Sequence, residues 1–390
     1  MSTAATSTAA TLVIHSAELV SGGAVVSDGW IAVSGDVIAA VGSGDGWRAS
    51  AGVETEVIDA EGRWLTPGFI DIHCHGGGGA AFDDGAAGIG VALALHRAHG
   101  TTRSVVSLVT APLADLEARL RVVAALTADD PRVLGSHLEG PFLDVGHKGA
   151  HPAGLLVAPT PDAIDRLLDA ASGTLRQVTI APEVDGGLAA IAQLTAAGVA
   201  VAVGHTSATY DQARAAFDAG ASILTHAFNG MPPLLHREPG PVGAAIAAGA
   251  TLELINDGVH VHPEVARILF AAAPGRIALI TDAMEAAGVG DGHYGLGGST
   301  VTVLDGVARL DDGGSIAGST LTLDAALRRA VTDVGLSVAD AVAAVTSVPA
   351  AAIGRGGDLG TLAPGNAADA VLLDADLGIH AVWAAGARLA

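Results

Sequence analysis

Histidines and carboxylates recur in this chain directly after short apolar runs, and the first such cluster is a His-X-His pair. His73 and His75 follow the run at residues 69–72 and precede four consecutive glycines. Residues two apart in a strand point to the same side, so both imidazoles are placed to bind one cation while Cys74 points away. Free cysteine is commonly a small core residue, and we interpret Cys74 as packing. The glycines would let the backbone turn sharply beside a bound group.

Glu139, His205 and His226 end later runs in the same way. A buried imidazole without a partner is costly, whereas a neutral imidazole on a cation is satisfied. The alternative for Glu139 is an ordinary buried carboxylate paired with an arginine. Three protein ligands with one position left for water are typical of catalytic zinc. We therefore predict a divalent-metal site, with Zn²⁺ as the expected ion.

Asp282 follows the last of the apolar runs and is the candidate acid/base. Its alternative role is to cap the turn or helix that comes next. An ionised carboxylate beside a cation can take a proton from water and return it to a leaving group. Together with the ligands, Asp282 predicts a metal-dependent hydrolase.

The elements that must position these residues alternate regularly. Through the middle of the chain, buried-strand patterns are separated by alanine- and leucine-rich helical patterns, among them residues 113–126, 161–171, 211–219 and 263–272. Eight parallel strands with intervening helices predict a (β/α)8 barrel, whose active site lies at the C-terminal strand ends. The expected strands are residues 69–75, 101–109, 132–138, 177–183, 199–205, 223–228, 251–256 and 277–282.

Both ends of the chain have a different sequence pattern, in which short runs of β-forming residues are separated by Gly, Ser and Asp residues typical of turns. We therefore predict an α/β fold of two domains. Residues 1–65 and 355–390 would form a small β-sandwich built from both chain ends. Residues 66–354 would form the TIM-like barrel that carries the catalytic site.

Composition narrows the function further. Hydrophobic residues make up 50% of the 390 residues and charged residues only 15%, which indicates a well-packed globular protein. The net charge of −22 argues against nucleic-acid binding. A single cysteine excludes an internal disulfide framework, the first residues do not resemble a secretory signal, and no apolar run is long enough to span a bilayer. We expect a cytoplasmic protein with no membrane partner.

An anionic substrate would need a local positive pocket against this negative overall charge. Arg237 lies in a long loop after the sixth expected strand and is a candidate anion clamp, because a guanidinium matches phosphate oxygens in a fork. An arginine in such a loop is otherwise usually solvated. His260 could add a second donor, and composition does not decide between these roles.

As an ordered set, the motifs resemble those of the N-acetylglucosamine-6-phosphate deacetylases of the amidohydrolase superfamily. The likeness extends over nearly the whole chain. The strings that carry it are residues 67–76, 137–143, 148–151, 204–210, 225–231, 237–240, 256–260, 281–284, 316–320 and 360–369.

The resemblance implies a role for individual residues. Glu139, His205 and His226 would bind the catalytic ion, Asp282 would be the acid/base, and His151 would polarise the acetamide carbonyl. The substrate would be contacted by Ala150, Asn229, Gly230, Arg237, Asp257, His260, Ile316, Ala317 and Gly318. Arg237 and His260 would reach the neighbouring subunit's site, which implies a homodimer with shared active sites.

The implied reaction is hydrolysis of N-acetylglucosamine 6-phosphate to glucosamine 6-phosphate and acetate, in amino-sugar catabolism. Family members differ in whether they keep the His-X-His pair. Because His73 and His75 are both present, a second ion bridged by Glu139 is open, giving one or two ions per subunit. Lys148, the only lysine, lies in a loop, which argues against superfamily branches that bridge metals through a carboxylated lysine at a strand end.

Three alternatives stay open at this point. The first is a deacetylase of another N-acetylhexosamine phosphate, such as N-acetylgalactosamine 6-phosphate. The second is an aminoacylase acting on N-acyl amino acids, from which the phosphate clamp would distinguish a sugar-phosphate enzyme. The third is a catalytically silent sugar-phosphate sensor, which would be expected to have lost ligands that this chain retains.

Overall fold

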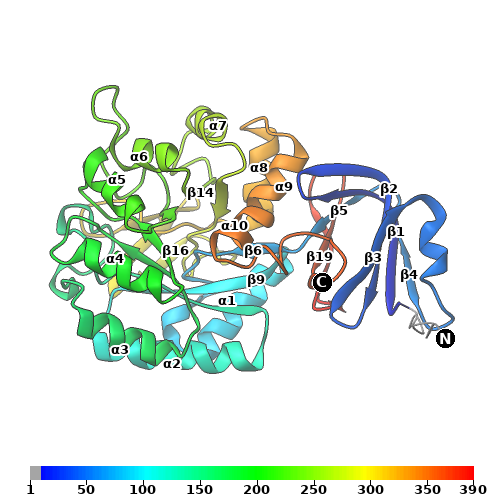
Figure 1. Cartoon of the computed structure of the whole chain (residues 1–390), viewed down its shortest axis with the longest axis horizontal. Helices are drawn as coiled ribbons and strands as arrows, with labels where there is room; N and C mark the ends of the chain where they lie inside the picture. Colours follow the sequence, from blue (N-terminus) through cyan, green and yellow to red (C-terminus); the bar gives the residue numbers. More distant parts are fainter. Residues whose placement is uncertain (1–9) are drawn as a thin grey trace.

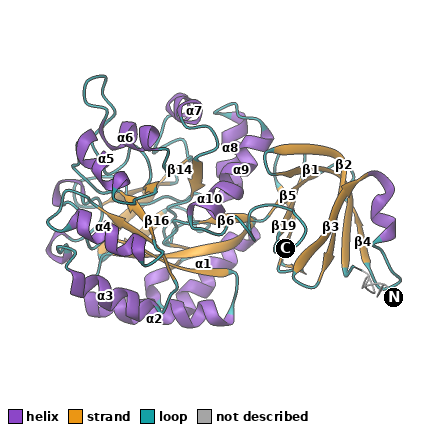
Figure 2. Cartoon of the chain, in the orientation of Figure 1, coloured by secondary structure: helices purple, strands orange, loops and turns teal. Residues whose placement is uncertain are grey.

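The computed structural model describes residues 10–390 of the chain. A larger body of helices and strands carries a smaller strand-rich body on one side, and the first and last described strands of the chain lie in the smaller one (Figure 1). Helices lie around the strands of the larger body, whereas the smaller body is almost entirely strand and loop (Figure 2). Within residues 10–390, each helix is too short or too polar to span a bilayer.

The larger body is built on an eight-stranded parallel sheet whose hydrogen-bonded order follows the chain. The sheet closes between its first and last strands, because the Asp282 N–H donates to the His73 carbonyl and the His75 N–H to the Ala283 carbonyl, each at 2.8 Å. The predicted (β/α)8 barrel is confirmed. Its strands are β6 (Phe69–Asp71), β9 (Thr101–Val109), β10 (Val133–Glu139), β11 (Leu175–Ile180), β12 (Ala200–Val203), β13 (Ile223–Leu224), β14 (Thr251–Ile255) and β15 (Ile277–Ile280).

Helices cover the outside of the barrel, so its strands are buried on both faces and read as continuous apolar runs. The α3 helix (Pro161–Ala171) shows why such a segment is helical and where it packs: the Thr160 side chain caps its start, Pro161 occupies its first turn, and Ile164 and Leu167 are buried. The helices are α1 (Ala86–Ala98), α2 (Leu113–Asp129), α3 (Pro161–Ala171), α4 (Gly187–Ala196), α5 (Tyr210–Asp218), α6 (Gly240–Ala248), α7 (Pro263–Ala272), α8 (Leu323–Thr332), α9 (Val338–Val345) and α10 (Ser347–Ala352).

Several barrel strands are shorter than predicted, and the physical reason is the same at three of them. The expected strands 199–205, 223–228 and 277–282 end at Val203, Leu224 and Ile280. Two residues further on, the backbone has a positive φ, at 47° for His205, 25° for His226 and 48° for Asp282. A residue in the left-handed conformation cannot continue the β-strand pairing, so His205, His226 and Asp282 lie in turns beyond the strand ends. The expected strand 69–75 also stops early, at Asp71.

The smaller body is formed by strands from both chain ends in one sheet. β1 pairs with β4 along its first half and with β5 along its second half, so the sheet divides at this strand. Leu12, Ile31, Leu65, Leu372 and Trp383 belong to its common core. The strands are β1 (Leu12–Ser21), β2 (Ala24–Ser34), β3 (Val37–Ser43), β4 (Glu56–Asp59), β5 (Trp64–Pro67), β19 (Ala370–Leu373), β20 (Ile379–Ala384) and β21 (Ala387–Arg388). We propose that the two bodies are domains, divided as in the sequence analysis.

Two small sheets that the sequence patterns did not predict lie after β6 and β15. The larger is antiparallel and packs Val301 and Ala308 against Met284 and Ala317, so it has its own apolar core. Its strands are β16 (Gly292–Leu296), β17 (Ser299–Leu304) and β18 (Val307–Leu310), and those of the smaller are β7 (Gly76–Gly77) and β8 (Ala80–Ala81). The turn between β16 and β17 brings Leu296 and Gly297 to the cavity described below.

Candidate active site

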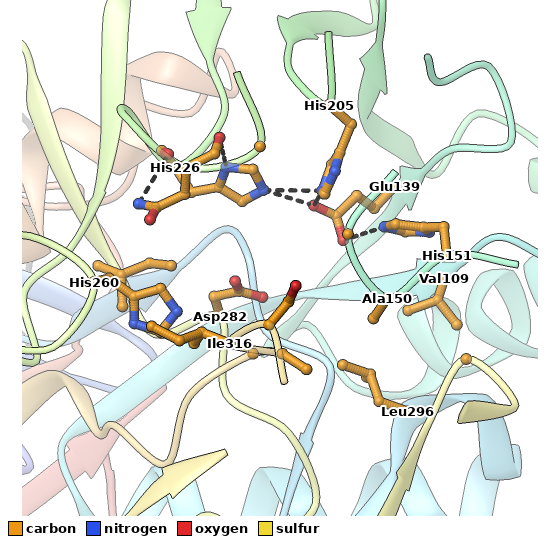
Figure 3. Close-up of a pocket in the computed structure, with 18 of the residues that line it drawn as sticks. Val109, Glu139, Ala150, His151, His205, His226, His260, Asp282, Leu296 and Ile316 are labelled. Carbon is orange, nitrogen blue, oxygen red and sulfur yellow. Dashed lines mark hydrogen bonds and ion pairs between the residues drawn. The ribbon is translucent and has the colours of Figure 1, made fainter. Parts of the chain in front are cut away.

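The predicted metal ligands meet above the C-terminal ends of the barrel strands. Glu139 is the last residue of β10, while His205 and His226 lie two residues beyond β12 and β13. Glu139 Oε1 lies 3.1 Å from His205 Nε2 and 3.2 Å from His226 Nε2, and these two nitrogens are 3.1 Å apart. Figure 3 shows the carboxylate of Glu139 between the two imidazoles and His151.

The hydrogen bonds on the far side of each imidazole decide which nitrogen carries the proton. His205 Nδ1 is 2.8 Å from the His147 carbonyl, and His226 Nδ1 is 3.1 Å from the Asn229 carbonyl. A carbonyl oxygen only accepts, so both Nδ1 atoms must donate, and the neutral form of each ring has its lone pair on Nε2, toward Glu139. Three acceptor atoms facing one another at this distance fit a divalent cation.

The His-X-His pair forms a second group on the other side of Glu139. His73 Nε2 and His75 Nε2 are 3.2 Å apart, and both rings are buried. Glu139 Oε1 is 3.3 Å from His73 Nε2, and Glu139 Oε2 is 3.1 Å from His75 Nε2. Asp282 Oδ1 lies 3.4 Å from His75 Nε2 and 3.6 Å from His73 Nε2. Glu139 therefore touches both groups, as a carboxylate bridging two ions would.

The carboxylates around His73 and His75 raise the pKa of both imidazoles. Burial opposes the charged form of His75, but hydrogen bonds to Asp282 and Glu139 outweigh it and raise its pKa to about 10. Burial likewise opposes the charge on His73, yet Glu139 and Glu253 raise its pKa well above the ordinary value. Without metal, both rings therefore carry a second proton and a positive charge at neutral pH, and a metal that binds them must displace that proton.

We expect zinc binding to chelator-treated protein at pH 7 to release about two protons per subunit, because a ligating imidazole must be neutral. Zinc affinity should accordingly fall as pH is lowered, since protons compete for the same nitrogens. Calorimetric titrations in buffers of different ionisation enthalpy measure the number released. A His73→Asn/His75→Asn variant should release fewer, and zinc binding without proton release would contradict the assignment.

His151 also faces Glu139, with Nε2 3.4 Å from Oε2. Its pKa is lowered to about 4, chiefly by burial and against the hydrogen bond to Glu139, so the ring is neutral at pH 7. Its Nδ1 lies 2.9 Å from the Thr110 hydroxyl. Its Nε2 faces the Glu139 carboxylate, which only accepts, so this contact favours a proton on Nε2, facing the site. The hydroxyl of Thr110 has one hydrogen, which can reach either Nδ1 or the Glu139 carbonyl at 3.3 Å. Thr110 was not predicted, although it follows β9 in the same way that the ligands follow their strands.

A cavity of about 410 Å³ opens beside these residues. Glu139, His151, His205, His226 and Asp282 line it (Figure 3). Most residues predicted to contact substrate also line it: Ala150, Asn229, Gly230, His260, Ile316, Ala317 and Gly318. Sequence reasoning missed seven lining residues. Six of them carry no chemical signal because they are apolar or small: Val109, Gly149, Ile255, Leu296, Gly297 and Ser315. The seventh, His147, could have been noticed as an imidazole in the loop that precedes His151.

Two predicted substrate residues lie outside this cavity. Asp257 instead holds His260, with Oδ2 2.7 Å from Nδ1, and so orients a residue that does line it. Arg237 lines a different surface hollow with Tyr210 and Pro232, and its Nη1 lies 2.6 Å from His236 Nε2. Within residues 10–390, the cavity lining includes no arginine or lysine.

The comparison with protein families agrees with this fold. The model of the amidohydrolase family matches residues 64–388, and the chain belongs to this family. Within it, the chain is 43% identical over 339 residues to N-acetylgalactosamine-6-phosphate deacetylase of Escherichia coli O157:H7, covering 86% of this chain and 90% of the relative. It is 35% identical over 354 residues to N-acetylglucosamine-6-phosphate deacetylase of Vibrio furnissii, covering 90% and 87%.

Solved structures show the same likeness. A mutant of the N-acetyl-D-glucosamine-6-phosphate deacetylase of Mycobacterium smegmatis, in complex with N-acetyl-D-glucosamine-6-phosphate, superposes with a TM-score of 0.91. It is 43% identical, and the match covers 97% of this chain and 99% of that one. The Pasteurella multocida N-acetylglucosamine-6-phosphate deacetylase gives a TM-score of 0.92 at 28% identity, covering 97% and 99%. The resemblance inferred from the motifs is confirmed.

Proposed function

We propose that this chain hydrolyses the N-acetyl group of N-acetylglucosamine 6-phosphate to glucosamine 6-phosphate and acetate, in amino-sugar catabolism. The observation that carries the proposal is the convergence of Glu139, His205, His226 and Asp282 on one cavity, with His151 opposite. The names of the relatives and the substrate in the Mycobacterium smegmatis complex support the substrate class.

Glu139, His205 and His226 would hold a divalent ion, which we propose is zinc, and His73 and His75 would hold a second with Glu139 between them. The bound ion would supply Lewis acidity toward water and the acetamide carbonyl. Asp282 accepts the proton of the attacking water and passes it to the nitrogen as the C–N bond breaks. His151, neutral and protonated on Nε2, donates to the carbonyl oxygen as negative charge develops there.

The charge state of Asp282 suits this exchange. Burial alone would raise its pKa, but the neighbouring His73 and His75 outweigh burial and lower it. The carboxylate is therefore ionised at neutral pH and can act as a base before it acts as an acid.

We further propose a homodimer in which Arg237 of one subunit binds the phosphate in the other subunit's cavity. Two observations support this: the cavity is lined by no cationic arginine or lysine of residues 10–390, and Arg237 lies outside it on a loop where Leu234 and Leu235 are 45% and 48% exposed. This loop connects β13 to α6. Phosphorylated sugars and a single buried thiol fit a cytoplasmic setting, which we propose as well.

The function is tested by acetate release from zinc-loaded protein. We expect turnover of N-acetylglucosamine 6-phosphate and a loss of kcat/KM of at least about 100-fold on the unphosphorylated sugar, since a buried phosphate contact to arginine is worth several kcal/mol. Arg237→Ala should remove most of this difference. Equal turnover of both sugars would remove the clamp from the proposal, and turnover of neither would contradict the proposed substrate.

Shared sites are tested by mixing inactive subunits under exchange conditions. Dimers of an Asp282→Asn subunit with an Arg237→Ala subunit carry both lesions in one site and leave the other site whole. We expect activity to reappear on mixing, to a fraction set by the share of mixed dimers. Proven exchange without recovery would contradict an arginine acting across the interface.

One specific observation favours a second substrate. The Escherichia coli relative is named for the galactosamine epimer. Its sequence is 43% identical to this chain, which equals the identity of the Mycobacterium smegmatis glucosamine enzyme. The same assay with N-acetylgalactosamine 6-phosphate ranks the two epimers by kcat/KM. N-acyl amino acids serve as the remaining comparison, and preferred turnover of these would replace the proposal with an aminoacylase.

A further inference from the structure

A glutamate inside the barrel lies behind the His-X-His pair. Glu253 is in the middle of β14, is fully buried, and does not line the cavity. Its Oε2 is 2.9 Å from His73 Nδ1, and its Oε1 accepts from Gln177 Nε2 at 2.7 Å. Its only ion pair among residues 10–390 is the one with His73.

The contact with Glu253 fixes which nitrogen of His73 is available. A carboxylate oxygen accepts, so His73 Nδ1 donates to it and the neutral ring keeps its lone pair on Nε2. That nitrogen faces His75, Glu139 and Asp282. A carboxylate behind a ligating imidazole also makes the ring a stronger donor to a metal. Glu253 Oε2 additionally lies 3.4 Å from the backbone N–H of His226, so it touches the turn that carries a ligand of the other group.

We infer that Glu253 is the positioning residue of a second metal ion held by His73, His75 and Glu139. The inference rests on the proposed metal site and not on the identity of the sugar. Burying a carboxylate with no arginine or lysine beside it is expensive, and the His73 ring is the group that compensates it.

Glu253→Gln is the most direct test. An amide has one oxygen where the carboxylate has two. That oxygen can accept from His73 while the NH2 group faces Gln177, but Gln177 must then turn over and accept in place of donating. In either orientation of the amide the negative charge behind His73 is lost. We expect zinc-loaded wild type to hold two ions per subunit and the variant to bind one of them about 10–100-fold more weakly. Equilibrium dialysis against a graded chelator, read by elemental analysis, measures both affinities without reference to activity.

Ser136→Ala is the matched control, because this buried hydroxyl lies on another barrel strand, β10, and has no hydrogen-bond partner among residues 10–390. Both ions should bind it as they bind wild type. Equal affinity in Glu253→Gln, or a wild type that holds one ion only, would overturn the inference. Acetate release by wild type tests the proposed function separately. Loss of the second ion in Glu253→Gln supports the positioning role of Glu253 even if wild type does not hydrolyse the sugar phosphate.

A second measurement tests the inference in the wild type, so it does not depend on whether Glu253→Gln folds. Nitrogen-15 labelling of histidine in the zinc-loaded wild type reports the protonated nitrogen of His73 directly, with His73→Asn used to assign the signal. A proton on Nδ1 supports the inference. A proton on Nε2 overturns it, because that nitrogen could then not ligate.

Discussion

Replacing Asp282 with asparagine is expected to lower kcat by about 10²–10⁴-fold, the range that a general acid/base contributes. The substitution keeps the shape of the side chain and removes its ability to carry a proton from water to the departing amine. KM should change little, since Asp282 lies beside the ligands and not among the residues expected to contact the phosphate. Steady-state acetate release at several pH values measures both constants.

The pH profile adds an independent check on this aspartate. In the metal-free protein, His73 and His75 lower the pKa of Asp282 despite its burial, and a bound cation would favour the ionised carboxylate in the same way. With zinc kept saturating at every pH, wild-type kcat/KM should therefore fall on the acid side only below the ordinary carboxylate range. In Asp282→Asn that limb should disappear. Asp291→Asn, at an aspartate that binds backbone N–H groups of Asp305 and Gly306 in a surface turn, is the control and should keep wild-type kinetics. Retention of more than a tenth of wild-type kcat in Asp282→Asn would remove Asp282 from its role.

Glu139→Gln is expected to abolish activity through loss of metal. Glu139 lies within 3.4 Å of five histidine nitrogens through its two oxygens, so the substitution removes the one charge shared by both groups. We expect zinc affinity to fall by at least about 100-fold, beyond the 10–100-fold typical of a residue that only supports a ligand. Elemental analysis and acetate release on the same samples measure the two losses together.

The same substitution changes stability in a direction that the charges determine. Burial raises the pKa of Glu139, but His73 and His205 outweigh it and hold it well below the ordinary value. The stabilisation from its charge is therefore present above the pKa of an unfolded glutamate, about 4.3, and is lost as pH falls. Metal-free wild type should unfold at a higher urea concentration than Glu139→Gln at pH 7, and the gap should narrow toward pH 3. Glu117→Gln, in the exposed pair with Arg166, is the control. An unchanged zinc affinity in Glu139→Gln would contradict the site.

The local pattern predicted the barrel and which candidate residues would lie together at its end. Each strand is a short apolar run because both of its faces are buried, and each ligand follows its run because parallel strands bring their C-terminal ends to one edge. His73, His205, His226 and Asp282 could thus be placed together without coordinates. The exact strand ends could not, because the left-handed positions after these strands are held by His205, His226 and Asp282 and not by glycine.

Other features depend on contacts that no local pattern records. Glu253 reads as an ordinary residue of a buried strand, and its partner His73 lies 180 positions away in the chain. Whether it faces the barrel interior depends on how the eight strands close. Arg237 is recognisable in the sequence as a cationic loop residue, but only the folded chain shows that it lies outside its own subunit's cavity. The order of strands in the sequence determines which side chains lie at the strand ends. The burial of Glu253 beside His73 depends instead on closure of the barrel, because the two residues are far apart in the chain.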